Sequence, residues 1–420
     1  MAASSHRSGL VIVFLTVMID LLGFGIVLPL LPRYAKYFNA EGLTLGLLMS
    51  SFSAMQFLFA PLWGRISDRV GRRPILLMGL AGSTLSYALF GWATGMAPDE
   101  TVLGANALTW LFITRIGAGI AGATIPTAQA YIADVTDSAN RGRGMAMIGA
   151  AFGVGFTFGP LIGAFFVTEE QGGAPSAGPG YVAAALSGLA FLYALLKLPE
   201  SLRVDSRPSG HHWLDLRSMK VALARRNVGM LLVTIFLTTF AFAQFEVTLS
   251  LLTQHMGLGA RHNFFVFAYV GFILTLSQGM LVRRLLPIWG ENRMAIIGTT
   301  LMMIGLMLIA ITADQRSLKL LYAIVPIAVV GFSALTPSLQ SLLSRQSLDT
   351  EQGGILGVGQ SMSALARIAG PSVGMVLFSR SVTSPYWTGT ALMAAGIVMV
   401  WSLKAPPSGE SIDPTTISAV

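Results

Sequence analysis

Long apolar runs alternate with short polar stretches along the chain. A helix that crosses a membrane needs about 20 predominantly apolar residues, and most of these runs reach that length. Glycine and proline inside the runs do not argue against helix, because both are commoner in membrane helices than in soluble ones. We predict twelve membrane-spanning helices, at 10–31, 43–63, 74–94, 104–126, 144–167, 180–197, 228–251, 264–286, 294–312, 318–342, 354–378 and 385–403.

The longest polar stretch follows the sixth run and divides the pattern into six runs and six runs. The expected organisation is an N-terminal six-helix bundle, a cytoplasmic linker, a C-terminal six-helix bundle and a cytoplasmic tail, over 1–198, 199–227, 228–404 and 405–420. His211 and His212 lie in the linker without a third metal ligand nearby. Because a metal site needs three or four ligands, we interpret them as solvated linker residues.

The two sets of runs share short motifs. Gly159-Pro160 in the fifth run recurs as Gly370-Pro371 in the eleventh, and the polar loop that begins at Gly64 has a counterpart that begins at Gly279. Repeated halves are typical of secondary transporters, in which the substrate site lies near the membrane midplane between the halves. The predicted fold class is therefore an all-α polytopic membrane protein built from two pseudo-symmetric six-helix bundles.

Composition and charge placement support a membrane protein. The 420-residue chain is 54% hydrophobic and only 11% charged, whereas soluble proteins have about 25% charged residues. The segments on the side of the termini hold 19 of the 27 Lys and Arg residues and carry the whole net charge of +8. Because positive loops face the cytoplasm, we expect both termini there. The basic excess is thus a topology signal, and we expect no nucleic-acid partner.

The opposite loops hold only six basic residues: Arg33, Lys36, Arg261, Arg316, Lys319 and Arg380. The sequence has no Asn-x-Ser/Thr acceptor for glycosylation, which favours the inner membrane of a bacterium. It also has no cysteine, no phosphate-binding loop and no zinc-protease motif. Because each of those chemistries requires its residues at a fixed spacing, we expect no enzyme activity, no metal and no cofactor.

Four charged residues interrupt the apolar runs: Asp20, Arg115, Glu246 and Arg367. Each costs several kcal/mol if it stays unpaired at the centre of a bilayer, about 2.5–3.5 on insertion scales. Asp20 and Arg115 fall at similar depth, which allows one ion pair, and Glu246 with Arg367 suggests a second. These pairs are either static and structural, or they couple protons or substrate. A carboxyl group binds a proton more tightly in a dry site away from arginine than in a wet site beside one.

Two further motifs suggest moving parts. The loop between the second and third runs is dense in charge and glycine, and we expect it to form a cytoplasmic gate through Gly64, Asp68, Arg69, Gly71, Arg72 and Arg73. In that interpretation Asp68 meets a helix amino terminus of the other half, and the arginines pair across the interface. Positive-inside charge alone is the simpler explanation of the arginines. The second motif consists of small residues and proline, which permit close packing and bending, at Gly155, Gly159, Pro160, Gly163, Gly370 and Pro371. We expect it either to form a sliding interface between the halves or to pack helices.

The stretch from Asp20 to Pro32, the loop from Gly64 to Arg73, the segment from Arg115 to Asp134 and Gly159-Pro160 together resemble the major facilitator superfamily. Within it, the chain is similar to the twelve-span drug:proton antiporters of the tetracycline-efflux type. The resemblance implies that Asp20 and Arg115 take part in proton coupling, and that Asp68, Arg69 and Arg72 belong to a gating loop.

The second half departs from the tetracycline pattern, because spans eight to ten contain no acidic residue. Glu246 and Arg367, with the run from Phe245 to His255, look more like a tetracycline-transporter-like branch that includes animal carriers of organic anions. The leading hypothesis is a monomeric, proton-driven antiporter that exports amphipathic organic molecules by alternating access. One alternative is a carrier of organic anions in which Arg115 or Arg367 binds the substrate. Another is a membrane sensor or scaffold that transports nothing.

Overall fold

The computed structural model describes residues 2–136, 141–167, 175–202, 226–346 and 352–403. Most of these residues are helical, and the described strands form one two-stranded antiparallel hairpin, in which Thr101 pairs with Asn106. Most of the expected linker, with His211 and His212, and the expected tail lie outside the described residues.

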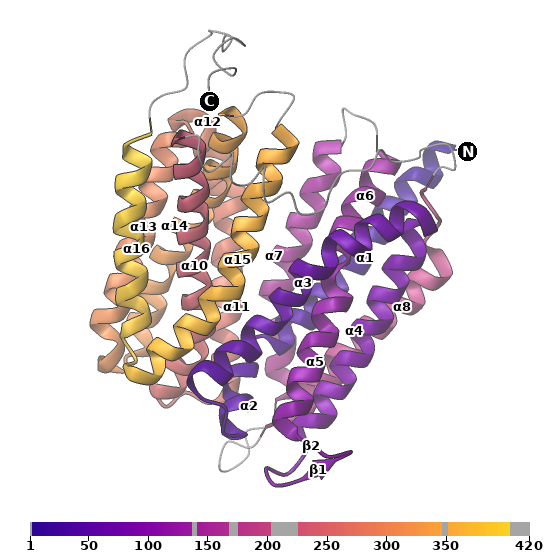
Figure 1. The fold of residues 1–420 in the computed structure, drawn as a ribbon, viewed down its shortest axis with the longest axis horizontal. Helices are drawn as coiled ribbons and strands as arrows, with labels where there is room; N and C mark the ends of the chain where they lie inside the picture. Colours follow the sequence, from indigo (N-terminus) through magenta and orange to yellow (C-terminus); the bar gives the residue numbers. More distant parts are fainter. Residues whose placement is uncertain (1, 137–140, 168–174, 203–225, 347–351, 404–420) are drawn as a thin grey trace.

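The first group of elements occupies one side of the molecule, drawn indigo to magenta in Figure 1. In chain order its elements are α1 (Ala2–Val27), α2 (Leu31–Tyr37), α3 (Gly42–Val70), α4 (Arg72–Thr94), β1 (Thr101–Val102), β2 (Ala105–Asn106), α5 (Ala107–Ala121), η1 (Gly122–Thr124), α6 (Ile125–Val135), α7 (Arg141–Phe166) and α8 (Gly178–Lys197).

The second group lies beside the first and is drawn dark pink to yellow (Figure 1). Its elements are α10 (Arg226–His255), α11 (Ala260–Leu276), η2 (Ser277–Val282), α12 (Arg283–Trp289), α13 (Glu291–Thr312), η3 (Ala313–Gln315), α14 (Leu318–Arg345), α15 (Gln352–Arg380) and α16 (Ser384–Trp401).

Ten of the described helical segments are long and apolar enough to cross a membrane. Two further helices, α7 and α16, occupy the places predicted for the fifth and twelfth spans but are not among these ten. The membrane-protein fold is therefore confirmed, and the count of twelve spans stays a prediction. Because α1 begins and α16 ends on the same side, we call that side the terminal face, and we call the opposite side, which carries β1 and β2, the hairpin face (Figure 1).

The fourth predicted span is longer than expected and is broken in the middle. Pro126 has no N–H to donate to the carbonyl of Gly122, four residues earlier, and the chain forms the short 3₁₀ turn η1 between α5 and α6. Gln56 of α3 donates its Nε2 to the Gly122 oxygen at 3.2 Å, and Trp63 donates its Nε1 to the Ile120 oxygen at 2.7 Å. Side chains of α3 thus satisfy the carbonyls that the break exposes.

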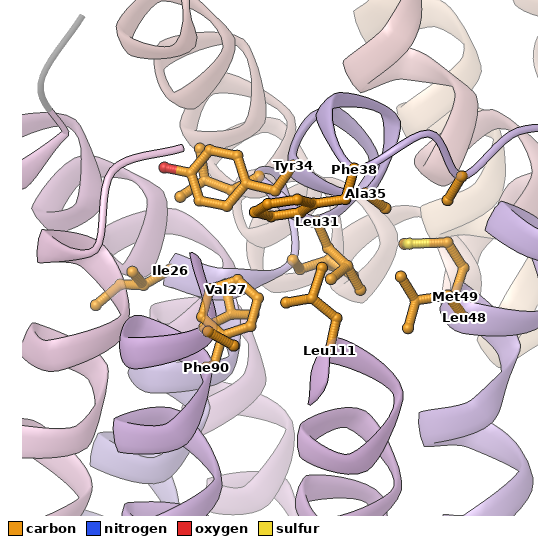
Figure 2. Close-up of a cluster of buried hydrophobic side chains, with 14 of the residues drawn as sticks. Ile26, Val27, Leu31, Tyr34, Ala35, Phe38, Leu48, Met49, Phe90 and Leu111 are labelled. Atoms are coloured by element: carbon orange, nitrogen blue, oxygen red, sulfur yellow. The ribbon is translucent and has the colours of Figure 1, made fainter. Parts of the chain in front are cut away.

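A hydrophobic core joins the two groups near the hairpin face. Figure 2 shows its first-group part, in which Ile26, Val27 and Leu31 pack with Tyr34 and Phe90. The same core includes second-group side chains, namely Val247, Leu251, Phe264 and Met375. Burial of this apolar surface holds the groups together on that side.

Toward the terminal face the two groups of helices diverge (Figure 1). A side chain added at Gly64 near the end of α3, or at Gly279 in η2, would meet no atom within 4 Å. A side chain added at Gly46, near the hairpin face, would instead lie 2.5 Å from the Ser372 Cα atom of α15. The molecule is therefore closed between its groups at the hairpin face and more open toward the terminal face.

Candidate functional site

Asp20 lies in α1, and neutral hydroxyl groups hold its carboxylate. Ser187 of α8 donates its Oγ to the Asp20 Oδ1 at 3.0 Å, and Ser83 of α4 is a second hydroxyl partner. The Asp20 side chain is half-buried and lines a small cavity within the first group. A carboxylate with hydroxyl partners keeps the ability to take up a proton, because no fixed positive charge stabilises its ionised form.

Arg115 lies in α5 with only 2% of its surface exposed. Its guanidinium carbon lies 4.5 Å from the ring centre of Phe52 and 5.9 Å from that of Phe24. These two rings lie 4.8 Å apart, so the cation rests against an aromatic wall, which attracts it through the ring quadrupoles. Within the described residues, the Arg115 Nε and Nη1 atoms have no hydrogen-bond partner.

In this conformation the expected ion pair between Asp20 and Arg115, both of them described residues, is not formed. The carboxylate points to Ser187, whereas the guanidinium lies over Phe52. Tyr87 of α4 is close enough to both for each charge to act on its phenol. Sequence position gives the depth of a residue along a helix but not its direction around the helix axis, and direction separates these two side chains. The sequence alone did not identify Tyr87, Ser83 and Ser187 as the side chains that interact with these charges.

Glu246 of α10 and Arg367 of α15 lie in the second group and act on one another electrostatically. Glu246 is half-buried, and Arg367, in the middle of its helix, is exposed. The described salt bridges do not include this pair. The structure thus brings the two residues near each other, as expected, but without a direct ion pair.

The charged loop between α3 and α4 is closed upon its own group. Gly71 ends α3 and begins α4 with φ +114°, which is in the region that favours glycine. The Arg72 Nη1 atom donates to the Ser67 Oγ at 2.7 Å and also pairs with Asp68. The Arg72 Nε atom pairs with the Asp134 Oδ2 of α6 at 3.2 Å.

Glu200, just beyond α8, caps the amino terminus of α4. It accepts hydrogen bonds from the backbone N–H groups of Arg72 at 2.8 Å and Arg73 at 3.1 Å. A carboxylate at this position satisfies free helical donors and complements the helix dipole. Sequence reasoning missed Glu200 because it lies 128 residues from Arg72.

In this conformation Asp68 and Arg73 contact their own group and not the other half, so the gate stays a prediction. Asp68 pairs with Arg72 four residues away, and Arg73 donates its Nη2 to the Leu195 oxygen of α8 at 2.8 Å. Arg69 is exposed, and Gly64 has open space beside it. The physical reason is the divergence of the groups, which leaves this loop without a surface opposite it.

The second group carries a matching but charge-reversed arrangement. Gly290, with φ +77°, ends α12 and begins α13, as Gly71 does between α3 and α4. Glu291 then takes the place of Arg72, and its Oε1 pairs with the Arg345 Nη2 of α14 at 2.7 Å. Ser341 also donates its Oγ to Glu291 at 3.0 Å. The repeat of glycines in the sequence was the signal that could have located this pair.

The small-residue motif packs helices within each group. A side chain at Gly155 would lie 2.8 Å from the Leu21 Cβ atom of α1, and one at Gly159 would lie 2.7 Å from the Leu22 oxygen. In the second group, a side chain at Gly370 would lie 2.9 Å from the Ala243 Cβ atom of α10. Pro160 and Pro371 lie inside α7 and α15.

The interpretation of this motif as an interface between the halves is therefore wrong for Gly155, Gly159 and Gly370. Gly163 is the exception, since a side chain there would collide with the Phe264 ring of α11. Gly155, Gly159 and Gly370 instead face the neighbouring helix of their own group. Spacing every four residues placed them on one face, but it did not reveal which helix that face meets.

Arg33 joins the groups at the hairpin face, although we expected it in a loop outside the spans. Only 9% of its surface is exposed. Its Nη1 donates to the Leu258 oxygen at 2.9 Å, and its Nη2 donates to the Thr253 Oγ1 of α10 at 2.7 Å. The carbonyl of Pro29 accepts from the Ser250 Oγ at 2.7 Å and from the Asn263 Nδ2 at 2.8 Å. We call these six residues the hairpin-face latch: Pro29, Arg33, Ser250, Thr253, Leu258 and Asn263.

Across the described ranges, no three His, Cys, Asp or Glu residues gather as a metal site would require. The candidate site is therefore a set of charged and aromatic side chains between and within two helical groups.

Comparison with known proteins agrees with this architecture. Residues 13–371 match the family model of the Major Facilitator Superfamily. The chain is 30% identical to the tetracycline resistance protein, class C, of Escherichia coli over 95% of this chain and 96% of that protein. It is 24% identical to multidrug resistance protein 2 of Bacillus subtilis over 96% of this chain and 97% of that one.

Among solved structures, the human organic anion transporter MFSD10 (TETRAN) superposes with a TM-score of 0.67 at 27% identity. That alignment covers 94% of this chain and 99% of the human one. The match to the family model, the two relatives and the shared fold lead to one conclusion. The chain belongs to the Major Facilitator Superfamily.

Proposed function

We propose that this protein is a proton-coupled antiporter that exports amphipathic organic molecules by alternating access. The proposal rests on the surroundings of Asp20. Its carboxylate lies within the first helical group, and the partners of that carboxylate are hydroxyls rather than a cation. A carboxylate locked to an arginine would stay ionised through a transport cycle. Asp20 can instead load a proton in one conformation and release it in the other.

The site supports an amphipathic substrate. Phe24 and Phe52 offer apolar surface beside the Arg115 cation, and Phe156 meets Phe24 edge to face at 5.9 Å. Similarity to a tetracycline resistance protein and to a multidrug resistance protein agrees with a substrate of this class. Glu246 and Arg367 provide a second pair of charges on the other group, and we assign them to coupling.

From the positive-inside distribution we infer that the terminal face, with both termini, lies in the cytoplasm. The conformation described here is then the one that is open inward. The bundles 1–198 and 228–404 rock against each other through the linker 199–227, and the tail 405–420 stays cytoplasmic. We place the protein in a bacterial inner membrane as a monomer, driven by the proton gradient and without a cofactor. Asp68, Arg69 and Arg72 serve as the inner gate, in a conformation where the groups meet at the terminal face.

One observation favours a second candidate, a carrier of organic anions. Arg115 is buried and has donors without partners, and a carboxylate ligand would satisfy them. The human transporter of similar fold is named for organic anions.

Flux in proteoliposomes separates these candidates. Labelled cationic, neutral and anionic amphipathic compounds are offered under an imposed pH gradient, and a pH-sensitive dye records the direction of proton movement. Proton movement opposite to substrate supports antiport. Gradient-independent uptake restricted to anions supports the second candidate, and the absence of flux for every compound contradicts both.

A further inference from the structure

A small cavity of about 20 Å³ reaches Asp20 from one side. Its lining residues all belong to the first group and include Thr16 of α1, Leu76 and Leu80 of α4, and Thr124 of η1. No residue of the second group lines it. The cavity is therefore bounded by first-group residues alone.

The cavity extends from Asp20 toward the terminal face. Thr16 precedes Asp20 in a helix that begins at that face, and Leu76 is four residues after the start of α4 there. Ala128 of α6, which continues toward the terminal face, completes that side. The cavity thus lies on the side of Asp20 that is nearer the terminal face.

The size and the polar groups of the cavity suit one water molecule. To hold a water molecule, a cavity needs roughly 10–15 Å³ of space for the centre of the water, and two to four polar partners. The Asp20 carboxylate can accept from such a water. The Thr16 Oγ1 already donates to the Val13 oxygen at 2.9 Å, so its free lone pair accepts. The Thr124 hydroxyl lies in the break between α5 and α6 and can donate.

We propose that a water held in this cavity by Thr16 and Thr124 carries the proton between Asp20 and the terminal face. The proton passes from the Asp20 carboxyl to the water oxygen, while that water gives one of its own protons to solvent water at the terminal face, which leaves the Asp20 carboxylate, a neutral water and a hydronium ion. This inference rests on the proposed proton coupling of Asp20. It adds that proton access does not require the second group or the substrate, and it makes Thr124 a positioning residue.

The other polar and titratable side chains near Asp20 lie outside the cavity. On α4, Tyr87 is the titratable group that interacts with Asp20, and Arg115 of α5 acts on Tyr87 as well. From α8 the partner is the hydroxyl of Ser187. Neither Tyr87 nor Arg115 nor Ser187 lines the cavity, so variants of the cavity leave these partners in place.

The test follows the proton on Asp20 directly. Infrared difference spectra of the purified full-length protein in lipid record the carboxyl C=O band, and the Asp20→Asn variant identifies the part that belongs to Asp20. After a pH jump, Thr124→Val, which keeps the shape and removes the hydroxyl, is expected to slow the change of this band by about tenfold or more. Ala128→Val, which fills the cavity, is expected to slow it as well.

The matched control is Thr127→Val. The Thr127 hydroxyl is fully buried on the same helix as Ala128 but does not line the cavity, so the control is expected to exchange at the wild-type rate. Wild-type rates in both Thr124→Val and Ala128→Val would overturn the inference while leaving coupling by Asp20 intact. An Asp20 band that never responds to pH would instead overturn the proposed function.

Discussion

Arg72 and Glu291 occupy equivalent places in the two halves and carry opposite charges. Each is the first residue of the helix that follows a glycine with positive φ. Arg72 pairs with Asp134, and Glu291 pairs with Arg345. Each of these two residues therefore pairs with an opposite charge in its own half, and the signs of the pair are exchanged between the halves.

The first prediction concerns this charge reversal. Arg72→Glu places an acid beside Asp68 and Asp134, so we expect a lower unfolding temperature in detergent. The loss is expected to be about 1.5–3 kcal/mol, the range for a hydrogen bond to a charged group. The double variant Arg72→Glu with Asp134→Arg is expected to recover part of it.

The matched variant Glu291→Arg is expected to cost less, at most about 1 kcal/mol, because the Arg345 side chain is 61% exposed. Equal losses for Arg72→Glu and Glu291→Arg would contradict the difference in burial. A double variant as unstable as Arg72→Glu alone would show that the Asp134 pair contributes nothing.

The second prediction distinguishes a glycine that packs helices within one group, Gly25, from a glycine that lies where the two groups meet, Gly46. Gly25→Ala would drive a side chain into the Gly155 carbonyl of α7, within one group, so unfolding in detergent is expected at a lower temperature. Gly46→Ala would meet Ser372 of the other group. Since the groups can separate there, Gly46→Ala is expected to keep its unfolding temperature and to disfavour the conformation closed at the hairpin face.

Gly279→Ala is the control, because nothing lies within 4 Å of the added carbon. It is expected to match wild type in both unfolding temperature and conformation. If Gly46→Ala lowers the unfolding temperature as much as Gly25→Ala, the close approach of α3 and α15 belongs to the folded core rather than to one conformation.

The third prediction concerns the hairpin-face latch. Arg33→Ala removes two hydrogen bonds between the groups. At about 1.5–3 kcal/mol for a charged hydrogen bond, the population open at the hairpin face is expected to rise tenfold or more. Arg33→Lys keeps the charge but loses the forked geometry, so its effect is expected to be intermediate.

The chain has no cysteine, which makes this shift measurable with a pair of spin labels. Asp99 and Asp314 are exposed on the hairpin face, one in each group. With Asp99→Cys and Asp314→Cys labelled, a longer distance distribution in Arg33→Ala is expected. An unchanged distribution would mean that the apolar core alone holds this face closed.

These residues show how far sequence reasoning reaches. The apolar runs predicted the helices well, because burial in a membrane imposes a length and a composition on each span. Asp20 and Arg115 were found because charge inside such a run is costly. Their failure to pair was not predictable, since the direction of a side chain depends on how neighbouring helices rotate. The break after Gly122 extended the fourth span to Val135, and the burial of Arg33 depends on a helix 220 residues away.

The fourth prediction concerns Arg115. Arg115→Lys keeps a positive charge but loses the planar group that stacks on Phe52. Binding of an anionic fluorescent ligand is expected to weaken by about 0.5–2 kcal/mol, the range for such a contact, and Arg115→Gln is expected to weaken it further. A neutral ligand of the same shape should change little. Equal weakening of both ligands would indicate that Arg115 supports the site rather than binding the anion.

The most direct test of the account is pH-driven transport by carboxyl variants in proteoliposomes. Asp20→Asn and Glu246→Gln proteins are expected to insert at normal levels, with Asp314→Asn, exposed on the hairpin face, as the control. The account predicts that at least one of the two loses substrate accumulation driven by the pH gradient while Asp314→Asn retains it. Full gradient-driven transport by both Asp20→Asn and Glu246→Gln would contradict it.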